Sequence, residues 1–66
     1  MNFAVRTIVR DATRNRVGRI TAVNGDCLAL TAPGHAPWDA LASWCEPATS
    51  AERRELQGKE QDAPAA

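Results

Sequence analysis

The order of apolar and polar residues predicts a series of short β-strands in the first 48 positions of the chain. Residues 1–9 are rich in β-branched side chains, which are typical of strands. Within them Val5 competes with Ile8 or Val9 for the inward face, and a β-bulge at the Ile8-Val9 doublet would reconcile the broken alternation. A polar turn is expected over residues 11–15, because Asp and Asn side chains there can hydrogen-bond to nearby backbone.

The next segment, residues 16–23, fits two kinds of element. Val17, Ile20 and Val23 have a spacing that also suits one face of a helix. The β-branched content, the glycine at position 18 and the flanking turns favour a strand instead. We therefore expect a strand that bends at Gly18, where the missing side chain allows sharp coiling.

Asn24-Gly25 is the strongest local signal in the chain. This pair between two apolar runs favours a type I′ hairpin, whose two central residues both need positive φ. Residues 27–31 then alternate, with Leu28 and Leu30 on one face. That face is predicted to be the core.

The remaining residues before position 48 complete the predicted sheet. Residues 32–37 contain two prolines and a glycine and are expected to form a loop. A short strand over 38–40, a single helical turn over 41–43 and a last strand over 44–46 follow. The predicted fold is mainly β: a small, five-stranded SH3-like barrel spanning residues 2–48.

The residues after the predicted barrel have a different composition, which is typical of a helix. Thr49 and Glu52 form a capping box, which predicts a short helix over residues 49–57 that ends at Gly58. Its few apolar side chains offer little for packing, and isolated helices of this length are marginal in water. Residues 58–66 are expected to be disordered.

Charge and composition narrow the classes of partner. The formal net charge of the 66 residues is zero, which argues against strong non-specific attraction to nucleic acid or to an anionic membrane. Five arginines nevertheless lie in the first third: Arg6, Arg10, Arg14, Arg16 and Arg19. They form either a local basic patch or, the reading we favour, the solvated face of a sheet.

Cysteine and histidine content predicts neither a metal site nor a cofactor. Cys27, Cys45 and His35 are too few and too widely spaced for tetrahedral zinc, and a disulfide would require that the two cysteine-bearing strands meet. The sequence shows no signal-peptide pattern and no apolar stretch long enough to span a bilayer. A cytoplasmic protein with reduced thiols is expected.

Several motifs together resemble a known group of proteins. These are Val9-x-Asp11, Arg16-Val17-Gly18-Arg19-Ile20, Gly25, Leu28-x-Leu30-x-x-Pro33-Gly34, Trp38-Asp39 and Pro47-Ala48. The pattern is similar to small, uncharacterised actinobacterial (Streptomyces-type) proteins, which often carry Gly-Gly-Gly-x-Glu before Trp-Asp where this chain has residues 34–37. The resemblance implies an SH3-like barrel and carries no known activity. A looser likeness, through residues 16–20 and 28–30, is to the KOW motif of transcription-elongation and ribosomal proteins.

The candidate binding residues are two tryptophans, one aspartate and three arginines: Arg14, Arg16, Arg19, Trp38, Asp39 and Trp44. Each tryptophan serves either the core or an exposed recognition surface. Asp39 receives a basic partner or, as we favour, caps the following turn or pairs with Arg16 or Arg19.

These residues predict a binding module and not an enzyme. A single histidine in a loop and thiols on inward positions provide no catalytic constellation, and so small a barrel has no room for a closed pocket. We expect an interaction module that binds a protein partner. The alternative is a KOW-like module that holds RNA or DNA phosphates through its arginines. Exposed edge strands also allow homo-oligomers.

Overall fold

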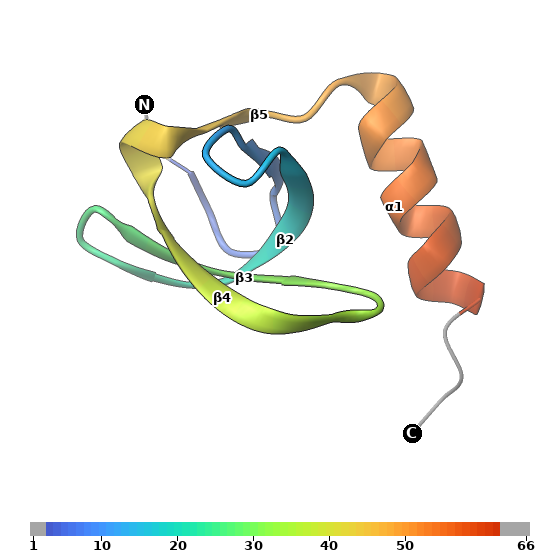
Figure 1. The fold of residues 1–66 in the computed structure, drawn as a ribbon, viewed down its shortest axis with the longest axis horizontal. Coiled ribbons are helices and arrows are strands. Elements are labelled where there is room, and N and C mark those ends of the chain that lie inside the picture. The colour runs from blue at the N-terminus through green and yellow to red at the C-terminus, as the bar shows by residue number, and fades with distance from the viewer. Residues whose placement is uncertain (1–2, 63–66) are drawn as a thin grey trace.

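The computed structural model describes residues 3–62 and the side chains of residues 3–61; it shows one antiparallel five-stranded sheet followed by a helix (Figure 1). The elements are β1 (Ile8–Asp11), β2 (Arg16–Asn24), β3 (Cys27–Ala32), β4 (His35–Leu41), the 3-10 turn η1 (Ala42–Trp44), β5 (Cys45–Pro47) and α1 (Ser50–Asp62). Neighbouring strands follow the order β4-β3-β2-β1-β5. The predicted mainly-β class with five strands, a helical turn before the last strand and a C-terminal helix is confirmed.

The sheet buries apolar side chains on both faces. The inner cluster consists of Val9, Ile20, Leu28, Leu30 and Ala40, and therefore includes both leucines predicted for the core. A second cluster, beneath α1, consists of Ile8, Ala32, Ala48 and Leu56. The neighbours Ile8 and Val9 thus point to opposite faces, and each is buried. Their pairing with β2 runs without interruption, so the bulge predicted at this doublet is wrong.

The first strand is shorter than predicted. Residues 3–7 are not a strand, and Val5 is 51% exposed instead of facing inward. Arg6 has a φ of 80°, and backbone hydrogen bonds from Arg6 N to Ile20 O (2.7 Å) and from Ile20 N to Thr7 O (2.9 Å) tie this bent segment to β2. Residues 1 and 2 lie outside the described part of the chain.

Residues 16–24 form a strand, which excludes the helical alternative. The change in which side chains face inward occurs at a register shift between Ile20 and Ala22, and not at Gly18 as predicted. Gly18 is needed for a different reason. A Cβ at this position would lie 2.8 Å from Cη2 of Trp38 and 3.1 Å from the Thr31 carbonyl oxygen.

Both hairpin turns differ in detail from the prediction. Asn24 still pairs with Cys27, so Gly25 and Asp26 are the central turn residues, and Gly25 alone has a positive φ, of 58°. Type I′ geometry, which needs positive φ at both positions, is therefore excluded. The expected loop over residues 32–37 shrinks to a two-residue turn. Ala32 ends β3, and residues 35–37 join β4, an edge strand on which the missing N–H of Pro37 is tolerated.

Helix α1 begins as predicted and ends later. The capping box is present: Thr49 N donates to Glu52 Oε1 at 2.9 Å, and Glu52 N donates to Thr49 Oγ1 at 3.1 Å. The predicted end at Gly58 is wrong, because the helix continues to Asp62. Leu56 is buried against the sheet and Glu60 binds Arg19, and these contacts stabilise the helix beyond the glycine. The other residues predicted to be disordered, 63–66, lie outside the described residues.

Candidate functional site

Asp11, at the end of β1, is the only fully buried charged residue among residues 3–61. Its Oδ1 accepts hydrogen bonds from Thr13 N (2.9 Å), Thr13 Oγ1 (2.7 Å) and Arg14 N (3.4 Å). Its Oδ2 accepts from Arg14 Nη1 (3.2 Å) and Trp38 Nε1 (3.0 Å). Burial by itself raises the pKa of Asp11, but these hydrogen bonds outweigh it and hold the pKa below its ordinary value. Asp11 is therefore an ionised anchor that orders the turn after β1.

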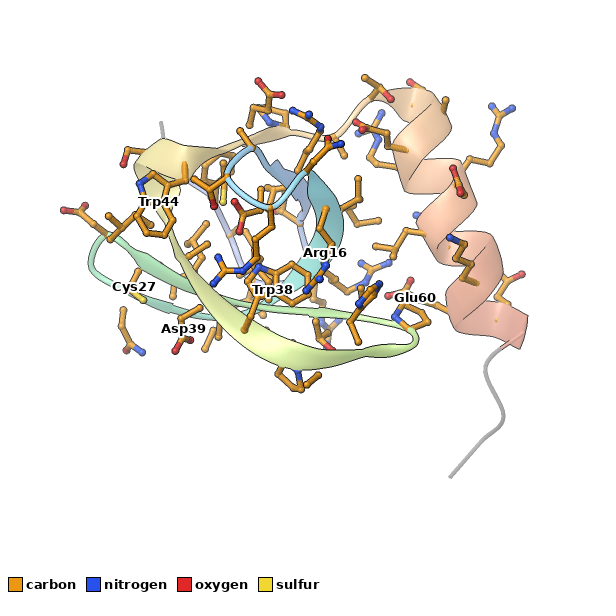
Figure 2. The ribbon with its side chains drawn as sticks, in the orientation of Figure 1. Arg16, Cys27, Trp38, Asp39, Trp44 and Glu60 are labelled. Carbon is orange, nitrogen blue, oxygen red and sulfur yellow. The ribbon has the colours of Figure 1, made fainter. Side chains whose placement is uncertain are left out.

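Trp38 lies across this anchor. Trp38 pairs with Leu30 of the inner cluster, so the indole lies on the inner face of β4. Its ring packs on Gly18. The guanidinium of Arg16 stacks on the ring at 4.9 Å from the centroid, within the range of a cation–π contact. Figure 2 shows Arg16 and Trp38 together in the middle of the molecule. Trp38 is thus a half-buried side chain that packs between Gly18 and Arg16 and keeps part of its surface in solvent.

Three of the clustered arginines bind carboxylates within the chain. Arg10 pairs with Glu46 at 2.7 Å, and Arg14 pairs with Asp11. Arg19 Nε and Nη2 bind the two carboxylate oxygens of Glu60 at 2.8 and 2.7 Å. The side chains of Arg6 and Arg16 make no hydrogen bond or ion pair with any of residues 3–61, and Arg16 alone stacks on an aromatic ring among these residues.

The Arg19–Glu60 pair fixes α1 against β2. The hydrogen bonds from Arg19 lower the pKa of Glu60, and the same bonds raise the pKa of Arg19. This position is on the helix side of the sheet. Arg19, predicted as a binding residue, therefore contributes to the helix contact and does not join Arg14 and Arg16.

Trp44 lies on η1, and its side chain is 40% exposed. Its carbonyl oxygen accepts a hydrogen bond from Ala12 N at 2.9 Å, which places η1 directly beside the turn that carries Arg14. We call the group formed by Arg14, Arg16, Trp44 and the solvent-exposed part of Trp38 the aromatic–arginine surface. The structure thus brings four of the six predicted binding residues to one region of the fold.

Asp39 lies elsewhere. Asp39 pairs with Ala29 of β3. Its side chain is exposed and lies on the face of β4 opposite to that of Trp38. Within residues 3–61 it neither caps the following 3-10 turn nor forms an ion pair, so the interpretation favoured from the sequence is wrong for Asp39.

Comparison with known proteins found no protein-family model, no curated protein and no solved structure that matches the chain. The resemblance to small actinobacterial proteins therefore stays a prediction. The structure does give its motifs a physical meaning. Asp11, Arg16, Gly18 and Trp38, which come from three separate motifs, meet at the buried anchor.

Few of the described side chains are suited to metal binding or catalysis. Within residues 3–61, no three metal-ligating side chains cluster. Burial, followed by the charge of Asp11, raises the pKa of the Cys45 thiol, which disfavours the nucleophilic thiolate. His35 is exposed at the start of β4, beside a shallow groove of about 260 Å³ along α1. Within residues 3–62, no helix has the length and apolar character to cross a membrane.

Sequence reasoning missed Asp11 as the centre of the site. The local signal was present, because an aspartate with a threonine two positions later is typical of a side chain that closes its own turn. The bond from Trp38, 27 positions away, carries no local signal.

Proposed function

We propose that this protein is a non-enzymatic interaction module that binds a protein partner through the aromatic–arginine surface. The observation that carries the proposal is the exposure of Trp44 beside the arginine-bearing turn. Tryptophan and arginine are the side chains that most often dominate binding energy at protein interfaces. The backbone hydrogen bond at Trp44 fixes the position of its main chain, so that part of the site needs little further ordering on binding.

The charges of this surface favour an acidic partner segment. Arg14 and Arg16 contribute two positive charges, and only one is balanced, by buried Asp11. Arg16 is half-buried, and its guanidinium is oriented by its stack on Trp38. A carboxylate of the partner would accept a pair of hydrogen bonds from such a fixed guanidinium. The proposed partner therefore presents an aspartate or glutamate together with an apolar side chain for Trp44.

A KOW-like nucleic-acid binder is the second reading, and it has weaker support. Arg10 and Arg19 lie against carboxylates of the chain itself, which reduces the positive charge available to phosphates. Trp44 is the only tryptophan among residues 3–61 with an exposed side chain, so base stacking has one platform.

We also propose that the sheet forms an SH3-like barrel and that the protein is cytoplasmic. Strand order β4-β3-β2-β1-β5, with a 3-10 turn between β4 and β5, supports an SH3-like barrel. The hydrogen bond from Trp38 to Asp11 supports closure, because it links the edge strand β4 to β1, the strand that pairs with the other edge strand, β5. The unpaired thiols Cys27 and Cys45 support a cytoplasmic location.

Affinity capture of partners from the native host, under nuclease treatment, tests the proposal. We expect one protein to be retained by the wild-type chain and lost with Trp44→Ala and with Arg16→Ala. Arg54→Ala is the matched control, since Arg54 is an exposed arginine on α1. Retention by all four chains would overturn the proposed surface.

Anisotropy titrations with labelled RNA and DNA separate the two readings. The protein-partner reading predicts no binding below the micromolar range. Sub-micromolar binding that falls steeply with salt and is lost on combining Arg16→Ala with Arg19→Ala would instead establish the nucleic-acid reading.

A further inference from the structure

A second surface lies at the end of the molecule away from α1, where the β2–β3 turn approaches η1 (Figure 1). A hollow of about 480 Å³ is lined there by Phe3, Asp26, Leu41, Ala42, Ser43 and Cys45. The backbone hydrogen bond from Ala42 N to Asp26 O, at 2.7 Å, fixes the two sides of this η1 hollow relative to each other. The hollow is therefore preformed.

Its lining combines apolar side chains with negative charge. Leu41 is 40% exposed, and Phe3 and Ala42 pack against the inner core. Asp26 is the one charged residue that lines the hollow. Asp39 lies two positions before Leu41 on β4, and so on the same outward face. Figure 2 shows Asp39 away from the Arg16–Trp38 pair.

These two carboxylates have no partner among the side chains that the structure describes. Neither the Asp26 nor the Asp39 side chain makes a hydrogen bond or ion pair within residues 3–61. Other acidic side chains differ in this respect: Asp11, Glu46, Glu52, Glu55 and Glu60 each pair with an arginine or lysine. The uncompensated negative charge of the sheet therefore gathers around an apolar hollow with an exposed leucine.

We propose that the η1 hollow binds a protein segment in which an apolar side chain is flanked by lysine or arginine. The apolar side chain enters the hollow against Phe3 and Leu41. The flanking cations face Asp26 and Asp39, where opposite charge steers the encounter and fixes the register of the segment. The hollow's volume of about 480 Å³ is within the range of sites that bury a small ligand.

This inference is independent of the aromatic–arginine surface, because the two share no residue and have opposite charge. A protein with both surfaces would hold an acidic segment at Trp44 and the turn after β1, and a basic segment in the η1 hollow.

A titration with a short peptide tests the inference on the full chain. The probe is acetyl-Arg-Leu-Arg-amide, and the control peptide is acetyl-Glu-Leu-Glu-amide; the readout is amide chemical shifts in two-dimensional NMR. We expect saturable shifts confined to Phe3, Asp26 and residues 39–45 with the basic peptide and none with the acidic one. Shifts that spread over the surface without saturation would overturn the inference.

Charge variants test the same binding with a matched control. The combination of Asp26→Asn and Asp39→Asn should weaken it about two- to tenfold, as expected from the loss of two screened charge contacts. Both side chains are exposed and make no contact that folding needs, and the amide spectrum of the variant reports its fold. Glu55→Gln, an exposed acid on α1, should leave binding unchanged. Equal affinity in the double variant and wild type would contradict the proposal.

Two further measurements separate alternatives. Arg16→Ala should leave binding of the basic peptide intact, so that failure of the proposed function and failure of this inference remain distinguishable. Concentration-dependent shifts at the hollow without peptide would show that a second copy of the chain occupies it, and would overturn the assignment to a basic partner segment.

Discussion

Trp38 Nε1 donates a hydrogen bond to Asp11 Oδ2 across 3.0 Å, and this bond links two strands that share no ladder. β4 is an edge strand, and β1 is separated from it by β3 and β2. Backbone pairing alone would therefore leave the sheet open along this side. The indole connects β4 to the strands beyond β3, with one ring on Gly18 of β2 and its N–H on the buried carboxylate of β1, while Arg16 covers the ring.

The Trp38–Asp11 bond can be tested by Trp38→Phe. Phenylalanine keeps an aromatic ring over Gly18 but removes the N–H, so Asp11 loses one donor while it stays buried. We expect the free energy of unfolding to fall by about 2 kcal/mol, as for hydrogen bonds to charged groups. Urea denaturation followed by circular dichroism measures this loss. Trp44→Phe, at the exposed position, should change stability by less than about 0.5 kcal/mol. Equal losses in both variants would contradict a special role for Trp38.

Two Gly→Ala variants should change stability in opposite directions. At Gly18 the new methyl group would lie 2.8 Å from the Trp38 ring and 3.1 Å from a backbone oxygen, so overpacking should cost about 1–3 kcal/mol. At Gly58, inside α1, nothing lies within 4 Å of the added Cβ. Alanine there should stabilise the protein by about 0.5–1 kcal/mol, because it is the better helix former. Thermal unfolding of both variants provides the measurement, and a stabilised Gly18→Ala would show that the ring does not rest on the glycine.

Acid should destabilise the protein mainly through Asp11. Its pKa is lower in the folded chain than in the unfolded chain, so the ionised form stabilises the fold above the ordinary carboxyl pKa. That stabilisation is lost as pH falls from about 5 through the lowered value, because the unfolded state then binds more protons. Glu60, whose pKa is also lowered, adds a smaller contribution because the Arg19–Glu60 pair is 28% and 29% exposed.

Urea unfolding at pH 7 and at pH 3 measures this dependence. Asp11→Asn should cost about 2–4 kcal/mol at pH 7 and lose less stability on acidification than the wild type does. Glu55→Gln, at an exposed position, should retain the wild-type difference between the two pH values. A pH dependence that persists unchanged in Asp11→Asn would assign the acid sensitivity to other groups.

Helix α1 should depend more on Leu56 than on its ion pair. Leu56 is buried with Ile8, Ala32 and Ala48, and Leu56→Ala should cost about 2 kcal/mol or more. A double-mutant cycle of Arg19→Ala and Glu60→Ala should return a coupling of about 0.5–1 kcal/mol, which falls with salt. Hydrogen exchange of α1 amides reports both effects locally. A coupling larger than the Leu56→Ala loss would show that charge, and not apolar packing, holds the helix.

Much of the fold follows from local patterns. Alternation predicted β3 with Leu28 and Leu30 inward, and the capping box predicted where α1 begins. Two of the errors share one cause. The end of α1 and the burial of both Ile8 and Val9 depend on the helix packing against the outer face of the sheet, a contact that no local window contains.

The sequence likewise predicted only part of the candidate site. The sequence by itself determined that aromatic and arginine side chains would stand near turns, and that Asp11 would close the turn after β1. Only the tertiary structure decided that Trp38 packs on Gly18, that Arg19 binds the helix, and that Trp44 stays exposed. Strand periodicity specifies which face a side chain takes, because it is set within the chain. Which side chains meet is set by the order and coiling of strands that are distant in sequence.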